Sequence, residues 1–373
     1  GLGDVYKRQV VDLYDELVKT DIRHILVRHE QGAVHAADGY ARASGGVGVC
    51  LVTSGPGATN TVSGIASAYM DSIPIVVLTG QVPSHLIGND AFQEVDIVGI
   101  TRPCTKHNYL VQRVEDLART IKEAFYIARS GRPGPVLVDL PKDVVQGATN
   151  YKPVKNIQLK SYNPTYEPNI KQLPKAIKLI KEAKKPVIFT GGGVILSRAA
   201  KELTQLARKI HAPVTATLMG LGSFPAKDPL WLGMIGMHGT YRANMSSSEC
   251  DLLIAVGVRF DDRVTGKTDT FAPKAKIIHI DIDPTSIRKN IPVAIPIVGD
   301  CKITLRKLNS LLSKEKMGNL KQKRKSWLNQ IGEWKATKPL AYEQKDVIKP
   351  QFVVEKLHEL TKGSAIITTE VGQ

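Results

Sequence analysis

Residues 185–193 read K-P-V-I-F-T-G-G-G, and the pattern in this stretch decides the fold. The run 186–190 holds no charged residue and does not alternate between polar and apolar, as is typical of a strand buried on both faces of its sheet. The glycines interrupt the strand, and a helical pattern follows near Arg198. The same order of strand, turn and helix recurs along the chain. It predicts an α/β fold of successive three-layer units with mostly parallel sheets.

The spacing of apolar residues, in uninterrupted runs for buried strands and at helical spacing for helices, predicts the other elements. We expect further strands at 24–27, 47–52, 74–79, 135–140, 213–217, 252–256, 276–282, 293–298 and 365–369. We expect helices at 10–19, 30–42, 58–70, 114–129, 171–183, 198–210, 303–312 and 351–360.

Changes in composition divide the chain into units. Residues 10–145 and 171–313 are each expected to form one α/β unit. The prolines, asparagines and lysines of residues 146–170 show no periodicity and indicate a linker. Residues 314–349 are expected to be a second connector, polar and basic, and residues 350–373 begin a third unit.

The two ends of the sequence look unlike the rest. Residues 1–9, G-L-G-D-V-Y-K-R-Q, match no pattern downstream, and we interpret them as an assembly scar. The strand expected at 365–369 opens a sheet for which no further strands follow. We therefore interpret the sequence as a fragment of a larger protein, incomplete at the start of its first unit.

Composition excludes several classes of protein. The 373 residues are 42% hydrophobic and 23% charged, as in globular proteins, with a formal net charge of +16. No apolar run approaches the roughly 20 residues of a membrane span. Residues 301–349 hold 13 Lys and Arg against 4 Asp and Glu, and no aromatic residue stands within the basic run 321–325. A solvated basic surface explains this better than a nucleic-acid site, so no nucleic-acid or membrane partner is expected.

Cysteine usage indicates a reducing compartment. The four cysteines, Cys50, Cys104, Cys250 and Cys301, lie far apart, without the close pairs of a zinc or thioredoxin motif. The sequence shows no secretory signal, so we expect a cytoplasmic protein. A plastid or mitochondrial location stays open, because residues 1–9 do not show a native start.

Two motifs of the first unit lie where a strand gives way to a helix. Glu30, in R-H-E-Q-G-A, follows an apolar run and starts a helix, where the helix dipole alone would favour a carboxylate. T-S-G-P-G-A-T-N, at 53–60, is a glycine turn that opens a helix, and such a turn approaches a ligand or merely turns tightly. Neither a complete G-x-G-x-x-G nor a Walker sequence occurs, which argues against a nucleoside triphosphatase.

The second unit repeats such strand ends five times. The motifs are T-G-G-G (190–193), T-L-M-G-L-G (217–222), G-M-H-G-T (236–240), G-V-R-F-D-D-R-V-T-G-K (257–267) and H-I-D-I-D (279–283). Backbone N–H groups at such glycines bind phosphate, Arg259 offers a cation, and Asp281 at a strand end suits a ribose hydroxyl. Each motif alone could be a tight turn or a surface ion pair. Together they favour a bound nucleotide-like cofactor.

Taken in order, these strings resemble a known family. R-H-E-Q-G-A, S-G-P-G-A-T-N, L-T-G-Q-V-P, D-A-F-Q-E and G-R-P-G-P-V-L-V-D-L-P-K-D resemble the acetohydroxyacid synthase (acetolactate synthase) catalytic subunit, a thiamine-diphosphate enzyme. The resemblance covers residues 10–373. G-M-H-G-T with R-F-D-D-R-V-T-G-K is the most selective part, and it resembles the FAD-dependent biosynthetic enzymes.

The resemblance implies a function and a site. The family decarboxylates pyruvate and joins the two-carbon unit to pyruvate or 2-ketobutyrate, in branched-chain amino-acid biosynthesis. Its cofactors are thiamine diphosphate, FAD and Mg²⁺. Glu30 matches the glutamate that hydrogen-bonds the aminopyrimidine ring and activates the cofactor, and Gln81 lies in the family's active-site loop. Gln373 matches the start of the diphosphate-binding wall.

Further residues are implied by the same resemblance. The substrate-channel positions are Pro83, Phe92, Gln93, Lys106 and Asp262. The FAD positions are Ser72, Arg132, Gly192, Thr217, Leu218, Ile235, Gly236, Met237, His238, Gly257, Val258, Arg259, Phe260, Asp261, Asp281, Ile282, Asp300 and Cys301.

Departures from the family limit these expectations. The family's metal-binding G-D-G segment does not occur here, so no metal ligand is named, and we expect Mg²⁺ in a domain beyond residue 373. The family forms its sites between two subunits, which implies a homodimer or higher oligomer, and it includes small regulatory subunits. We expect the chain alone to be inactive. The alternatives left open are another thiamine-diphosphate and FAD enzyme, such as pyruvate oxidase or glyoxylate carboligase, and a flavin-binding module without catalysis.

Overall fold

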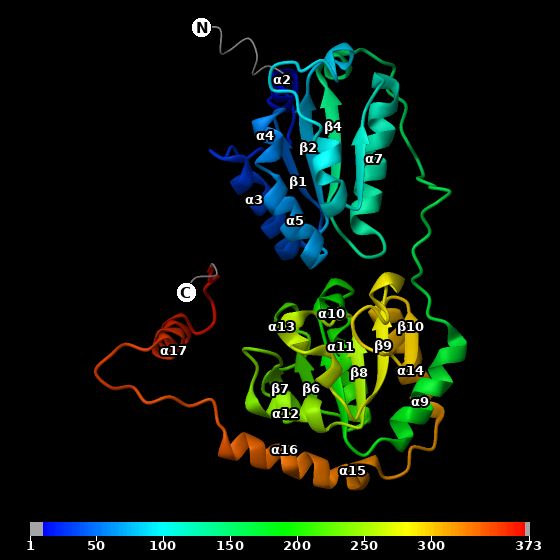
Figure 1. Cartoon of the computed structure of the whole chain (residues 1–373), viewed down its shortest axis with the longest axis vertical. Helices are drawn as coiled ribbons and strands as arrows, with labels where there is room; N and C mark the ends of the chain where they lie inside the picture. Colours follow the sequence, from blue (N-terminus) through cyan, green and yellow to red (C-terminus); the bar gives the residue numbers. More distant parts are fainter. Residues whose placement is uncertain (1–9, 370–373) are drawn as a thin grey trace.

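The computed structural model describes residues 10–369 and contains two separate parallel β-sheets (Figure 1). The first sheet has the order β1-β2-β4-β3, and the second has the order β10-β9-β8-β5-β6-β7. Every neighbouring pair of strands in both sheets is parallel. This confirms the α/β class that the uninterrupted apolar runs predicted.

The first unit holds one sheet and its helices. Its strands are β1 (Gly48–Val52), β2 (Ile75–Gln81), β3 (His107–Leu110) and β4 (Val136–Pro141). Its helices are α2 (Val11–Leu17), α3 (Glu30–Ser44), α4 (Pro56–Thr59), α5 (Val62–Asp71), α6 (Ile97–Thr101), α7 (Val114–Arg129) and α8 (Lys142–Gln146).

Both faces of the first sheet are covered. One core joins α3, α5 and α6 to the sheet, and a second joins α7 and α8 to its other face. All residues of β4 are buried, which explains why its sequence does not alternate. Helix α3 begins after His29, whose ring accepts a hydrogen bond from the Gln31 amide, and it ends at Gly45 in a left-handed conformation.

The second unit is larger. Its strands are β5 (Pro186–Thr190), β6 (Val214–Ala216), β7 (Trp231–Met234), β8 (Leu252–Val256), β9 (Lys276–Asp281) and β10 (Ile295–Val298). Its helices are α9 (Leu173–Glu182), α10 (Gly192–Leu196), α11 (Ala200–Lys209), α12 (Tyr241–Glu249), α13 (Asp262–Thr265) and α14 (Cys301–Lys314). The last helices of the chain are α15 (Leu320–Lys323), α16 (Lys325–Thr337) and α17 (Pro350–Thr361).

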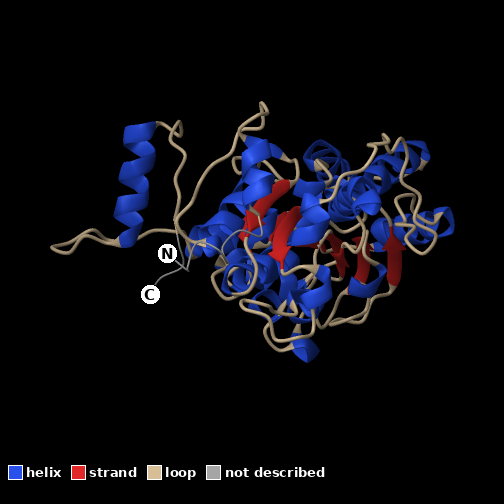
Figure 2. Cartoon of the chain, turned by 90° about the horizontal axis from the view of Figure 1, so that it is seen from above, coloured by secondary structure: helices blue, strands red, loops and turns tan. Residues whose placement is uncertain are grey.

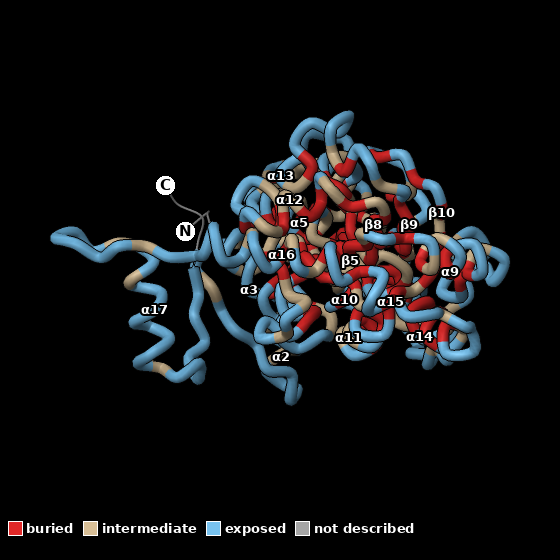
Figure 3. The backbone as a smooth tube through the Cα atoms, turned by 90° about the horizontal axis from the view of Figure 1, so that it is seen from below, coloured by how far each residue is buried: buried red, intermediate tan, exposed pale blue. Residues whose placement is uncertain are grey.

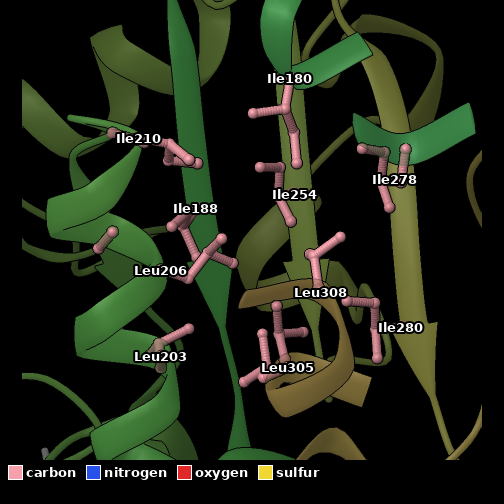
Figure 4. Close-up of a cluster of buried hydrophobic side chains, with 14 of the residues drawn as sticks. Ile180, Ile188, Leu203, Leu206, Ile210, Ile254, Ile278, Ile280, Leu305 and Leu308 are labelled. Atoms are coloured by element: carbon pink, nitrogen blue, oxygen red, sulfur yellow. The ribbon is translucent and has the colours of Figure 1, made fainter. Parts of the chain in front are cut away.

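The second sheet is the middle layer of three, and Figure 2 shows strands in red that lie between blue helices. Helices α9, α11 and α14 pack on one face, where Leu203 and Leu206 of α11 and Leu305 of α14 meet the strand residues Ile188 and Ile254 (Figure 4). Helices α12 and α16 cover the other face. Because the strands are parallel, their carboxyl ends meet at one edge of each sheet.

The structure differs from expectation in several elements. The expected strands at 24–27 and 365–369 are irregular, and Leu26 and Ile366 are 81% and 96% exposed. A strand is stabilised only by pairing, so an apolar β-prone run without a neighbour forms no ladder. The expected helix 58–70 is divided into α4 and α5. Strands β3 and β7 and helix α12 were not predicted.

The expected basic connector at 314–349 is also partly wrong. Helices α15 and α16 dock on the second unit, where Trp327 is buried and its indole N–H donates to the Pro186 carbonyl at 3.2 Å. Arg324 is fully buried, and it donates to the Ile180 carbonyl at the end of α9. Helix α17, by contrast, buries no residue and lies apart from both sheets (Figure 3).

Candidate functional site

Glu30 is the first residue of α3, at the edge of the first sheet where the strands end. Its Oε2 accepts a hydrogen bond of 3.0 Å from the side-chain amide of Asn60. Its Oε1 lies 3.5 Å from the point that a Cβ on Gly57 would occupy. The atom nearest to that point is Thr53 Cγ2 at 2.7 Å, so packing against Thr53 requires glycine at 57, and the Glu30 carboxylate lies in van der Waals range just beyond it. Asn60 was not predicted, although it stands in the quoted motif.

The S-G-P-G turn packs against the D-A-F-Q-E segment. Gly55 has a φ of 58°, and a Cβ on it would lie 2.6 Å from the Gln93 carbonyl oxygen. The side-chain Oε1 of Gln93 is buried and has no hydrogen-bond partner among residues 10–369. The structure thus places Gln93 against the turn that lies beside Glu30.

Gln81 is not in an open loop. It is the last residue of β2, is 3% exposed, and has its side-chain amide bound inside the protein. The amide nitrogen donates to Asp139 Oδ2 at 2.9 Å and to the Val95 carbonyl at 3.0 Å, and Oε1 accepts from the Val82 amide at 2.9 Å. The buried Gln81 side chain therefore binds neighbouring residues of the protein and does not face solvent.

The other expected channel residues are spread over several elements. Pro83 follows β2, Phe92 is exposed on the segment before α6, and Asp262 is exposed at the start of α13 in the second unit.

Lys106 corrects our expectation of a channel wall. Its ammonium group is part-buried at the end of α7, where it donates to the carbonyls of Ile127 and Ser130 and to the Tyr162 hydroxyl. All three N–H donors are used, and burial, followed by the nearby Arg132 cation, lowers the pKa of Lys106 to about 8. The lysine caps the helix and offers no free charge to a substrate.

The glycine motifs of the second unit bring backbones together. Gly257 has a φ of 61°, and a Cβ on it would lie 2.7 Å from the Gly193 Cα. The Gly193 amide donates to the Gly257 carbonyl at 3.1 Å. Gly192, beside them, starts α10. Glycine is required here by packing between strand ends, so the motif alone does not show a phosphate site.

The two most selective motifs do lie together. The Met237 amide donates to the Arg263 carbonyl at 2.9 Å, and a Cβ on Gly236 would lie 2.5 Å from the same oxygen. Met237 and His238 are exposed, so this loop pair offers side chains to a ligand.

Several expected FAD contacts have other structural roles. Ile235, Val258, Phe260 and Cys301 are buried in the two cores, so only their backbones could contact a ligand. Side-chain oxygens of Thr217, Asp261 and Asp300 cap helical turns by accepting from the backbone. Leu218 is exposed, and Ile282 and Arg259 are half-buried near the same edge.

Ser72 and Arg132 connect the first unit to the second. Arg132 Nε donates to the Ser72 hydroxyl at 2.9 Å, and its Nη1 forms a 3.1 Å ion pair with Asp283, two residues after Asp281. The Asp281 carboxylate accepts from the Asp283 amide at 2.9 Å. Burial raises the pKa of Asp281 to about 7, although the Asp283 amide and the cations of Arg132 and Arg259 oppose this. The resemblance implied Ser72, Arg132 and Asp281 as FAD positions far apart in the sequence, and the structure brings these three residues together through Asp283.

The sequence analysis did not single out three residues near the carboxyl ends of the strands. Asp139 and His279 are buried within strands, and Asp283 pairs with Arg132. A charged or polar residue inside an apolar run is the signal that could have found the first two. Gln373 and residues 1–9 lie outside the described residues. Between residues 10 and 369, no cluster of three metal-ligating side chains is found and no helix is long and apolar enough to span a membrane.

Comparison with known proteins places both units. The thiamine pyrophosphate enzyme N-terminal TPP binding domain matches residues 5–100, and the thiamine pyrophosphate enzyme central domain matches residues 173–308. The chain belongs to the thiamine pyrophosphate enzyme family. Curated relatives within it include acetolactate synthase large subunits, which confirms the resemblance drawn from the motifs.

Three relatives illustrate the match. The chain is 52% identical to the acetolactate synthase large subunit of Haemophilus influenzae and 51% identical to the isozyme 3 large subunit of Escherichia coli, each over 98% of the chain. It is 50% identical to acetolactate synthase 1, chloroplastic, of Nicotiana tabacum over 97% of the chain. The chain spans 64% of the length of the two bacterial relatives and 55% of the plant one.

Proposed function

We propose that this chain supplies the pyrimidine-side and flavin-binding units of an acetolactate synthase. The enzyme would decarboxylate pyruvate and join the two-carbon unit to a second pyruvate or to 2-ketobutyrate. The observation that carries the proposal is the Glu30 carboxylate, held at the start of α3 by the side-chain amide of Asn60 from the glycine turn motif. Membership of the thiamine pyrophosphate enzyme family supports it.

Glu30 would exchange a proton with a ring nitrogen of the bound aminopyrimidine. Thiamine diphosphate, when bound, supplies a carbon nucleophile and takes up the electron pair left by decarboxylation. Asn60 holds one carboxylate oxygen of Glu30, which leaves Oε1 for the ligand. Gln93 offers its buried Oε1 to a donor on the substrate side.

FAD would bind at the edge of the second sheet. Asp281 carries a buried carboxylate that accepts one hydrogen bond, from the Asp283 amide, and can also accept from a hydroxyl such as that of a ribose, while Arg132 and Arg259 offer cations to a diphosphate. Met237 and His238 add exposed side chains from a neighbouring loop. The flavin would be structural, since carboligation needs no net redox step.

The proposed function also implies a metal ion and protein partners. Mg²⁺ would bind with the diphosphate, through residues outside those described here. A homodimer or higher oligomer would complete the site, and a small regulatory subunit would associate with it, because the relatives are named large subunits. A cytoplasmic or chloroplast location is proposed from the same comparison.

The substitution Glu30→Gln tests the proposal when acetolactate formation is measured with the full-length protein that contains this sequence. The amide keeps the shape but weakens proton exchange, so acetolactate formation should fall by about 10²–10⁴. Glu115→Gln, on the exposed start of α7, is the matched control and should be active. FAD binding should persist in both. A loss below threefold in the Glu30 variant would contradict the role. Acetyl phosphate or acetate formed with flavin reduction would indicate an oxidase instead.

A further inference from the structure

Asp139 is a buried carboxylate for which the proposed chemistry gives no use. It stands in β4 among apolar residues and is 1% exposed. Its Oδ1 accepts from the Thr79 hydroxyl at 2.7 Å, and its Oδ2 accepts from the Gln81 amide at 2.9 Å. Burying a charge costs free energy that an apolar residue at this position would not cost, so the carboxylate calls for a reason.

The amide of Gln81 can face only one way. The Val82 N–H donates to Oε1, so the NH₂ group must point toward Asp139 and Val95. Both of its protons are then used, one on the Asp139 carboxylate and one on the Val95 carbonyl. Gln81 thus connects the interior of the sheet to the segment that follows η1 (Ser84–Leu86).

The segment that Val95 ends is held at two further points. The Glu94 carboxylate accepts from the amides of Gly88 and Ala91 at 2.5 and 3.0 Å. The Gln93 backbone lies against Gly55, in the same turn as Gly57 beside Glu30. Displacing Val95 would therefore move the contact that shapes the turn next to Glu30.

We propose that Asp139 is a positioning residue of this site: through the Gln81 amide and the Val95 carbonyl, it fixes residues 91–95 against the turn beside Glu30. The catalytic meaning of that placement rests on the proposed function. The simpler alternative is that Asp139 only ties β4 to β2 through Thr79. The backbone ladder already joins Thr79 and Asp139 in register, so that tie adds little.

Hydrogen exchange of this chain separates the two roles. Asp139→Leu should raise exchange in peptides covering residues 82–96 at least about tenfold, because the buried Gln81 amide loses its acceptor on Asp139. Asp139→Asn keeps the network, since its oxygen accepts from Gln81 and its NH₂ donates to the Thr79 hydroxyl, so exchange should stay within about twofold of wild type. Thr79→Val, the matched control, removes only the other partner and should leave residues 82–96 unchanged. Exchange of residues 252–256 reports whether each variant is folded.

Gln81→Met provides a second route if Asp139→Leu does not fold. It removes the connection to Val95 but leaves the Thr79–Asp139 bond, and it should reproduce the increase in exchange. The proposal is overturned if neither variant changes residues 82–96, or if Thr79→Val changes them as much as Asp139→Leu. In the full-length protein, Asp139→Leu should lower kcat and leave FAD affinity unchanged. A wild type that makes no acetolactate would refute the proposed function, while hydrogen exchange would still decide the positioning role.

Discussion

Asp139 and Asp281 are both buried aspartates near the carboxyl ends of parallel strands, one in each sheet. Burial raises the pKa of each carboxyl to about 7. Asp139 has side-chain donors on both oxygens, from Thr79 and Gln81. Asp281 has one backbone donor on Oδ1, and its Oδ2 has no hydrogen-bond partner among the described residues.

The difference shows what each edge is built to hold. His279 lies 3.8 Å from Asp281 Oδ2, but its Nε2 is already bound to the Val258 carbonyl at 2.8 Å. Burial lowers the pKa of His279 to about 4, so the ring is neutral and offers Asp281 no charge. Asp139 is thus satisfied within the protein and supports its neighbours. Asp281 has one oxygen without a protein donor, as the proposed flavin site requires.

The largest expected effect separates the two aspartates by ligand binding. Asp281→Leu should weaken FAD binding about 10–100-fold, because a hydrogen bond to a charged group contributes about 1.5–3 kcal/mol. Asp139→Leu should leave FAD binding within about twofold, since its network belongs to the other sheet. Titration of the purified variants with FAD, followed by flavin absorbance and fluorescence, measures both. Equal losses in the two variants would refute the comparison.

Some of the fold could be predicted because parallel strands buried on both faces have a distinctive composition. The strands at 186–190 and 252–256 were predicted to the residue. The helices after 314 could not be read in the same way, because lysines conceal a helical stripe of buried residues at 320, 324, 327 and 331. One of the four is an arginine, which composition assigns to the surface.

The site was predictable only as a set of motifs. Glu30 and the S-G-P-G turn lie in one short region, so the sequence brings them together by itself. The contact of Ser72 and Arg132 with Asp283 depends on how two units meet, and no local pattern contains that information. Gln81 was expected to act in the active site and Lys106 to line the substrate channel, but the polar groups of both side chains bind inside the protein. Burial decides this direction, and the local sequence does not show it.

The next effect is a pH dependence of FAD affinity that only Asp281 should cause. A hydroxyl donor favours the ionised carboxylate, so binding should lower the raised pKa of Asp281. Affinity should therefore increase as pH rises through about 7, by roughly tenfold between pH 6 and 8. Asp281→Asn should remove most of this dependence, whereas Asp139→Asn should retain it. A pH-independent affinity in the wild type would show that Asp281 does not accept from the ligand.

The pH dependence of the unfolding free energy should depend on the other aspartate, Asp139. The folded-state pKa of Asp139 is about 7, above the ordinary value of 3.8, so the folded state binds the proton more tightly than the unfolded state. The stability this contributes is present at acidic pH and is lost as pH rises through 7. Relative to Asp139→Asn, the wild type should lose about 1 kcal/mol of unfolding free energy between pH 6 and 8. Urea unfolding at both pH values, followed by circular dichroism, measures the difference. A constant difference would mean that Asp139 does not titrate in this range.

The smallest expected effect concerns the ion pair that links the two units. Arg132 and Asp283 are part-buried, and the 3.1 Å contact joins the loop before β4 to the residue two positions after β9. Part-buried pairs couple by about 0.5–1 kcal/mol, so a double-mutant cycle with Arg132→Gln and Asp283→Asn should give a coupling energy in this range. The coupling should fall as salt is raised from 50 to about 500 mM, less steeply than that of the more exposed pair of Lys274 and Glu249. If Arg132 turns toward a flavin diphosphate, added FAD should reduce the coupling further, because the guanidinium then has a second anion to bind. A coupling that FAD leaves unchanged would assign Arg132 to the interface between the units alone, and Asp281 would remain the candidate contact of the second edge.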